Sequence, residues 1–155
     1  MMMATTTRML RCVSLVSIVI FAVFVSECSS QRSVFDPVHA SIKNDIAQRV
    51  ELNIWCKSKN TDFGHHRLTY GAKFIWKFKI NFWHTTLYWC KMWWTDVNGK
   101  YTEGSYAIYK AKRDWDKCEN ECNFSVRKGG IYRKEMYNDD AYDLVYPWPK
   151  RLVTK

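Results

Sequence analysis

Apolar and polar residues alternate along two segments of the chain with the period of two that is typical of a β-strand. In residues 50–58, one face carries the apolar side chains of Val50, Leu52, Ile54 and Cys56. In residues 73–81, one face carries the aromatic side chains of Phe74, Trp76 and Phe78. The alternate positions are mostly polar or charged, so we predict strands with one face toward the core and the other toward water.

A different pattern marks residues 85–94, "TTLYWCKMWW", which form the most apolar stretch of this part of the chain. They show no clean alternation, which predicts a central strand that is covered on both faces. Asn98 and Gly99 follow, and both residue types tolerate positive φ, so we expect a tight hairpin turn there. Residues 101–110 then form the returning strand.

Shorter apolar segments recur about every ten residues, separated by turn-forming residues, and no helical period is sustained. These predicted strands lie near residues 39–44, 65–70, 122–128 and 130–136, with a last extended piece at 142–148. Aromatic and β-branched residues, which suit pleated surfaces, are abundant. We therefore predict an all-β fold, a small antiparallel β-sandwich of about eight short strands.

The first thirty residues differ from the rest and predict a secretory signal peptide. Two arginines precede an apolar run of thirteen residues, and small residues follow it. The run is shorter than the roughly twenty residues that a membrane-spanning helix needs. We expect residues 31–155 to form one secreted, extracellular domain with no membrane span.

Four cysteines remain after residue 30, and an even number in an exported small domain indicates a disulfide framework. The strand pattern points Cys56 and Cys90 toward the core, while Cys118 and Cys122 flank a short polar connector. We favour pairing Cys56 with Cys90 and Cys118 with Cys122. A crossed pairing that ties the connector to the core is a close alternative.

The net charge of residues 31–155 is +8, because the first thirty residues hold two of the 24 Lys and Arg and one of the 15 Asp and Glu. A basic surface favours acidic partners, such as a receptor face, an acidic wall polysaccharide or an anionic lipid. Net charge also keeps a protein soluble, and this simpler interpretation has equal weight. We do not expect nucleic acid to be the partner.

The run "WCKSKNTDFGHHRL", residues 55–68, gathers residue types that occur in metal sites and in cysteine-dependent active sites. Adjacent His65 and His66 point to opposite faces of a strand, so they do not suit one metal ion. A histidine-based nuclease is the sharpest enzyme alternative, since four histidines occur in a basic chain. The histidines are scattered, however, and we predict no catalytic residues, no metal and no cofactor.

The tryptophans also suggest a carbohydrate-binding surface, because exposed indole rings can stack on sugars. A sandwich of this size must fill its core, and we expect most of one group of tryptophans to lie there: Trp55, Trp76, Trp83, Trp89, Trp93 and Trp94. Residues 123–125 form the sequon Asn-Phe-Ser, which predicts N-glycosylation of Asn123.

With these residues in view, the chain resembles the plant self-incompatibility S-protein family between about His39 and Tyr132. Four segments carry the resemblance in order: "ASIKND", "LNIWCKSKNTDFGHHRL", "FIWKFKINFWHTTLYWC" and "KCENECNFSVRKGGIY". Trp55 stands where a histidine is common in the family. The resemblance implies a secreted β-sandwich with two disulfides built from Cys56, Cys90, Cys118 and Cys122, and it carries over no catalytic residue.

The founding members of that family are pistil-secreted ligands that a pollen receptor recognises in the rejection of self pollen. The resemblance therefore implies a signalling ligand for a cell-surface receptor, and we expect this ligand to be a monomer. Loops on a rigid scaffold commonly carry recognition, and we expect contacts from residues 57–65, 95–101 and 112–121. The candidate contact residues are Lys59, Asn60, Asp62, Asn98, Lys100, Arg113 and Asp116. The alternative function is direct binding of wall carbohydrate or membranes in defence.

Overall fold

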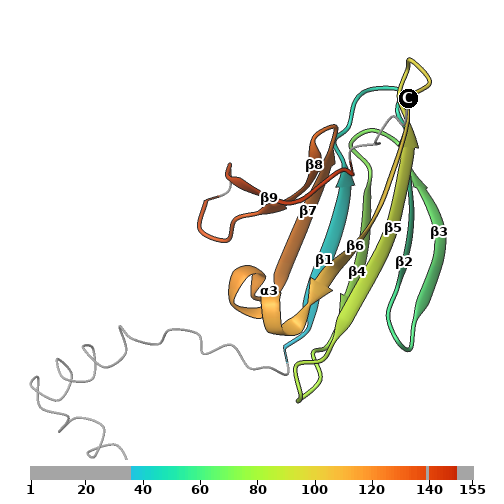
Figure 1. Ribbon diagram of the computed structural model, residues 1–155. Helices are drawn as coiled ribbons and strands as arrows, with labels where there is room; N and C mark the ends of the chain where they lie inside the picture. Colours follow the sequence, from blue (N-terminus) through green and yellow to red (C-terminus); the bar gives the residue numbers. More distant parts are fainter. Residues whose placement is uncertain (1–35, 139, 150–155) are drawn as a thin grey trace, which may run out of the picture. The chain divides into compact units, whose positions relative to one another are not determined.

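Two β-sheets and one helix make up the part of the chain that the computed structural model describes, residues 36–138 and 140–149 (Figure 1). The predicted signal peptide lies outside these residues. One sheet has the strand order β4-β1-β7-β8-β9 and the other β3-β2-β5-β6. The elements are β1 (Val38–Asn44), β2 (Leu52–Lys57), β3 (Asp62–Leu68), β4 (Lys73–Phe78), β5 (Leu87–Thr95), β6 (Tyr101–Lys110), α3 (Ala111–Cys118), β7 (Glu121–Arg127), β8 (Gly130–Lys134) and β9 (Tyr142–Pro147).

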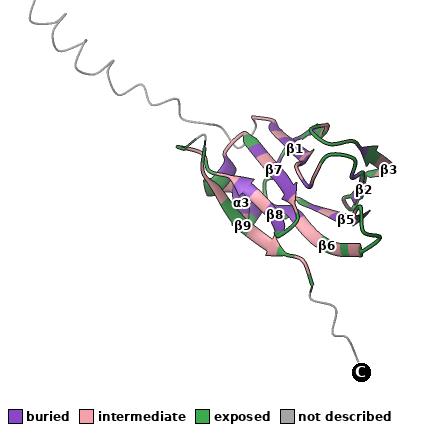
Figure 2. Ribbon diagram, turned by 90° about the horizontal axis from the view of Figure 1, so that it is seen from above, coloured by how far each residue is buried: buried purple, intermediate pink, exposed green. Residues whose placement is uncertain are grey.

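The inner faces of both sheets supply the core, as the alternation predicts. Leu52, Ile54 and Cys56 of β2 are fully buried, and β1 and β7 are buried along much of their length (Figure 2). The all-β, disulfide-stabilised fold is thus confirmed. α3 is the one helix described, and no helix among the described residues is long and apolar enough to cross a membrane.

Both disulfides brace this frame. Cys56 is joined to Cys90, and these residues lie opposite each other on neighbouring strands β2 and β5. Cys118, the last residue of α3, is joined to Cys122 in β7. This is the pairing that the strand pattern favours, and the crossed alternative is not found.

β5 differs from its expected form, because it is covered on one face only. Tyr88, Cys90, Met92 and Trp94 are buried, whereas the residues between them are exposed or half-buried. The outer positions include Trp89 and Trp93, so large apolar side chains on a partly wet face hide the alternation in the sequence.

The turn between β5 and β6 is also not the tight two-residue turn that we predict from Asn98-Gly99. Gly99 has a φ of 78°, but Asn98 is not among the residues with positive φ. Asp96 organises a longer connection: its carboxylate accepts the backbone N–H groups of Asn98 at 2.9 Å and Lys100 at 2.8 Å. These hydrogen bonds to the aspartate side chain order the turn without a second residue in the left-handed conformation.

Two further differences concern the direction of one strand pair and the presence of a helix. β1 and β7 pair in parallel, with Ile42 opposite Phe124, so the fold is not purely antiparallel. The predicted polar loop at residues 112–121 is mostly the helix α3, which is too short for its period to be evident in the sequence. α3 follows directly from β6 and returns the chain to the start of β7.

Asp45, at the end of β1, links that strand to β7 through its side chain. Asp45 lies 2.8 Å from the ammonium group of Lys43 and accepts a hydrogen bond of 2.7 Å from the hydroxyl of Ser125. Partial burial opposes the ionisation of Asp45, but these two partners outweigh it and lower the pKa of the carboxyl group below its ordinary value.

Candidate recognition surface

The run of residues 55–68 forms the end of β2, a loop and all of β3, and its histidines are split as predicted. The His65 ring stacks on Trp93, with 5.1 Å between ring centroids. The His66 ring contacts Phe74 on the other face, and its Nε2 lies 2.8 Å from the carbonyl oxygen of Phe63. Among the described residues, no three His, Cys, Asp or Glu side chains gather in a geometry that could hold a metal ion.

The loop between β2 and β3, residues 58–61, is ordered by its own side chains. The Ser58 hydroxyl accepts the backbone N–H groups of Asn60 at 3.3 Å and Thr61 at 3.1 Å. Asp62 then accepts the N–H of Gly64 at 2.8 Å and the indole N–H of Trp55 at 2.6 Å. These hydrogen bonds, of which the one from Gly64 has the larger effect, lower the pKa of Asp62. Asp62 is therefore an anion with its partners already in place.

The connection between β4 and β5, residues 79–86, lies beside this loop. The Asn81 side chain bonds both to the backbone N–H of Thr85, at 2.8 Å, and to its hydroxyl, at 2.6 Å. The N–H of Asn81 donates to the hydroxyl of Thr86 at 3.0 Å, and His84 adopts a φ of 52°. The tip of this turn is Phe82-Trp83, which we did not select from the sequence, although two adjacent aromatics between polar residues were a usable signal.

A groove of about 670 Å³ separates the two loops. Tyr88 and Trp89 are among its lining residues, together with several hydroxyl-bearing side chains. Lys57, Lys59 and Lys79 are the charged residues among those that line it. An opening with this lining favours an anionic ligand or an acidic segment of a partner.

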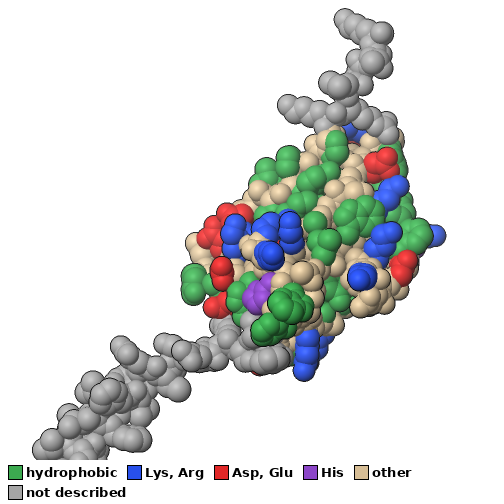
Figure 3. Space-filling view, turned by 60° about the horizontal axis from the view of Figure 1, so that its bottom comes forward, with side chains coloured by type: hydrophobic (Ala, Val, Ile, Leu, Met, Phe, Trp, Pro, Cys, Tyr) green, Lys and Arg blue, Asp and Glu red, His purple; other side chains and the backbone are tan. Residues whose placement is uncertain are grey.

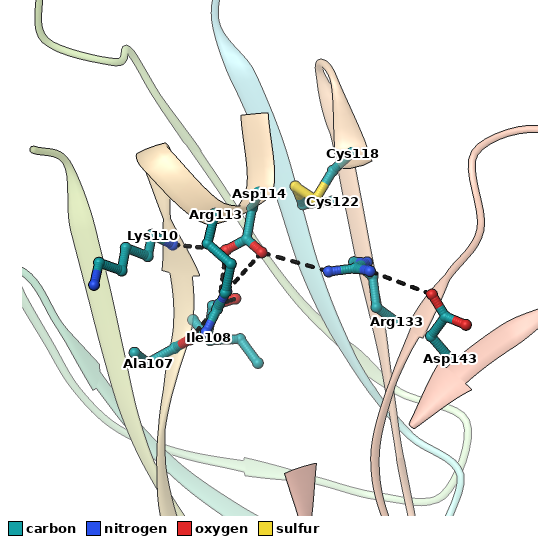
Figure 4. A network of polar contacts seen from close by, with 9 residues as sticks. All are labelled: Ala107, Ile108, Lys110, Arg113, Asp114, Cys118, Cys122, Arg133 and Asp143. Atoms are coloured by element: carbon teal, nitrogen blue, oxygen red, sulfur yellow. Dashed lines mark hydrogen bonds and ion pairs between the residues drawn. A yellow bond between two sulfur atoms is a disulfide. The ribbon is translucent and has the colours of Figure 1, made fainter. Parts of the chain in front are cut away.

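Helix α3 borders the same end of the molecule and is fixed by the fully buried Asp114 (Figure 4). The Asp114 carboxylate accepts the backbone N–H of Lys110 at 2.7 Å and the guanidinium of Arg113 at 2.7 Å. Arg133 of β8 lies 3.4 Å from its other oxygen. Because β6 and β8 belong to different sheets, this carboxylate ties the helix to both of them.

We call the loops of residues 58–61 and 79–86, together with α3, the α3 end. A backbone hydrogen bond of 2.9 Å from Ala111 to the carbonyl of Thr86 joins the helix to the second loop. Figure 3 turns this end forward and shows hydrophobic side chains gathered beside Lys and Arg side chains. The β5–β6 loop lies at the opposite end of the strands (Figure 1).

The candidate contact residues are therefore divided between the two ends. Those at the α3 end are Lys59, Asn60, Asp62, Arg113 and Asp116; those at the opposite end are Asn98 and Lys100. Arg113 is half-buried and paired with Asp114, and it lies on helix α3 and not in a loop; its selection as a contact residue stays a prediction. Asp116 is exposed, but on a helix and not in a loop.

The tryptophans fill less of the core than expected. Trp76 and Trp94 are buried, whereas Trp55 is 44% exposed and Trp83 75% exposed. The expectation that most of the six named tryptophans lie in the core is therefore wrong. Lys57 lies over the Trp89 ring at 5.4 Å from its centroid, so a cation covers part of an indole that the core does not use.

Asn123 lies on β7 at a half-buried position, next to Ser41 of the neighbouring strand β1. The Ser41 hydroxyl donates a hydrogen bond to the side-chain oxygen of Asn123. Ser125, the third residue of the sequon, is buried. Glycosylation of Asn123 remains a prediction from the sequon.

Comparisons with known proteins give a consistent result. The model of the family described as "Plant self-incompatibility protein S1" matches residues 39–148. S-protein homolog 24 of Arabidopsis thaliana is 34% identical over 141 residues, covering 88% of this chain and 89% of the relative. Self-incompatibility protein S1 of Papaver rhoeas is 29% identical over 116 residues, covering 74% and 78%.

A solved structure shares the fold at 22% identity, with a TM-score of 0.54 over 75% of this chain and 97% of the other. It belongs to the SPH proteins (self-incompatibility protein homologues), described as a widespread family of small, highly stable, secreted proteins from plants.

Proposed function

The chain belongs to the plant self-incompatibility protein S1 family, and from this premise we propose that it is a secreted recognition ligand that binds a cell-surface receptor through its α3 end. It acts by binding and not by catalysis. Its partner is an acidic region of a receptor involved in the rejection of self pollen or in related signalling between cells.

The observation that carries this proposal is the meeting of two loops around one lysine-lined groove, with helix α3 hydrogen-bonded to the second of these loops. Lys59 and Asn60, which the sequence marks as contact residues, are exposed on one side of it, and Lys79 lines it from the other loop. Basic side chains at the rim of a binding surface steer acidic partners and speed their association.

The frame under this surface is rigid, which favours recognition by a fixed shape. Cys56 lies two residues before the first loop, and its disulfide joins β2 to β5. Cys118 ends α3 and is joined to β7. A surface that is ordered before binding loses little conformational entropy when the partner arrives.

The test uses the secreted, tagged protein recovered from plant cells that express the full-length chain. We expect saturable, high-affinity binding to intact protoplasts of the responding tissue, and protease treatment of the protoplasts should abolish this high-affinity component. Lys59→Glu should weaken binding at least tenfold, because it reverses a charge beside the groove. The matched control is Lys100→Glu, an exposed lysine in the loop at the opposite end, which should change binding less than twofold.

Two results would overturn the proposal. If Lys100→Glu weakens binding and Lys59→Glu does not, the receptor reads the opposite end. If binding survives protease treatment and is reproduced on purified acidic polysaccharide, the protein binds the cell wall and not a receptor.

A further inference from the structure

The tip of the β4–β5 connection exposes two large apolar side chains side by side. Phe82 is 74% exposed and Trp83 75% exposed. Their rings contact each other edge to face, with 5.2 Å between centroids and an interplanar angle of 84°. Two adjacent apolar side chains that are exposed to this degree mark a surface that a membrane or a partner molecule covers.

The fold holds this tip in place. Asn81 bonds to Thr85 and Thr86 on the far side of the turn, and the N–H of His84 donates to the carbonyl of Asn81 at 2.9 Å. The hydrogen bond between Ala111 and Thr86 then ties the turn to α3. The two rings are therefore presented outward by a braced turn.

Cationic and hydroxyl groups lie directly behind the tip. Asn81 and Thr85 line the groove that also holds Lys57, Lys59 and Lys79, and no Asp or Glu is among its lining residues. Ser58 and Thr61 add hydroxyl groups on the facing loop. Ammonium and hydroxyl groups together are suited to the phosphate of a lipid headgroup.

From this arrangement we infer that the α3 end is a peripheral membrane contact, in which Phe82 and Trp83 enter the interface of a bilayer and the lysine-lined groove takes an anionic phospholipid headgroup. Tryptophan prefers the level of the headgroups, where its ring is partly apolar and its N–H is hydrated. Each lysine near an anionic surface adds electrostatic attraction. This site goes beyond the proposed receptor contact and does not require a receptor.

The ring geometry favours a bilayer over a polysaccharide. A sugar stacks on the flat face of a ring, and a platform for a linear saccharide needs rings that lie roughly in one plane. The two rings here are nearly perpendicular. A perpendicular pair makes a wedge, which a disordered lipid interface accommodates more readily than a rigid sugar chain.

The experiment is flotation of the secreted protein with two kinds of vesicle, one of phosphatidylcholine alone and one of equal parts phosphatidylcholine and phosphatidylserine. We expect binding to the anionic vesicles that weakens with added salt. Phe82→Ser with Trp83→Ser should weaken it at least tenfold, and Lys59→Gln or Lys79→Gln about fivefold each. The control is Val97→Ser with Lys100→Gln, because Val97 is 73% exposed at the opposite end.

A second readout tests insertion itself. Phosphatidylcholine with brominated acyl chains quenches tryptophan that enters the bilayer, so fluorescence should fall when anionic vesicles contain it. Trp83→Phe should retain binding but lose most of this quenching, although the other tryptophans remain.

The inference is overturned if the protein fails to float with anionic vesicles, or if the tip variant and the control behave alike. It is also overturned if soluble acidic polysaccharide displaces the vesicles completely and binds with the same dependence on Phe82 and Trp83, because the site is then a saccharide site. Pure lipid holds no receptor, so a negative result here leaves the receptor proposal standing.

Discussion

Replacing Asp114 by asparagine should destabilise the protein strongly while leaving its shape almost unchanged. Asp114 is fully buried, and its carboxylate bonds at 2.7 Å both to the backbone N–H of Lys110 and to Arg113. It also faces Arg133, whose side chain is only 9% exposed, at 3.4 Å. Asparagine keeps one oxygen but removes the negative charge, which leaves the buried guanidinium of Arg133 with Asp143 alone among the carboxylates shown in Figure 4.

Removing one partner of a buried ion pair costs about 3–5 kcal/mol. For a domain of this size, such a loss lowers the melting temperature by roughly 10 °C or more. The assay is thermal and urea unfolding of the secreted protein with both disulfides intact. The matched control is Asp116→Asn, which neutralises an exposed carboxylate on the same helix and should change the free energy of unfolding by less than about 0.5 kcal/mol.

The reasoning is refuted if Asp114→Asn costs less than about 1 kcal/mol, or if Asp116→Asn costs as much. If Asp114→Asn also loses receptor binding at temperatures where it is still folded, then recognition requires that α3 be held in place.

Three further predictions concern the frame. Replacing the pair Cys56–Cys90 by alanines should lower the free energy of unfolding by about 3.8 kcal/mol, and replacing Cys118–Cys122 should lower it by only about 1.9 kcal/mol. The difference arises because the sequence separations of 34 and 4 residues close loops of very different entropy. Equal losses in urea unfolding would contradict this. The lowered pKa of Asp45 means that its contribution to stability is present above the ordinary value of 3.8 and is lost as pH falls through the lower folded value, so Asp45→Asn should flatten acid unfolding in that range. Gly130→Ala should cost more than about 2 kcal/mol, since its Cβ would clash with the backbone oxygen of Tyr146 in β9. Gly64→Ala, at a φ of 71° in open space, should cost only about 1 kcal/mol.

Local alternation located most strands, because a half-buried strand must place apolar side chains at every second position. β2 follows this rule closely, with Leu52, Ile54 and Cys56 fully buried. The rule misled at β5, where Trp89 and Trp93 lie on the outer face and hide the period. A pattern of residue types shows what could be buried, but it does not show what is covered.

Part of the proposed recognition surface was also visible in the sequence. Lys59 and Asn60 were selected as loop residues, and they lie beside the groove. The tip residues Phe82 and Trp83 are not among the contact residues that the sequence predicts, and Trp83 belongs to the tryptophans expected mostly in the core. Exposure of an aromatic depends on whether another element passes over it, and the polar residues on either side favour an exposed tip without deciding this.

The sequence by itself determined the family, the positions of the strands and the cysteines that brace them, because these features depend on local periodicity and on a few residue types in order. Only the tertiary structure decided that β1 and β7 pair in parallel, that Asp114 joins a short helix to both sheets, and that residues 58–61 and 79–86 meet around one groove. These contacts join residues far apart in the chain, and their energies arise only when both partners are brought together and removed from water.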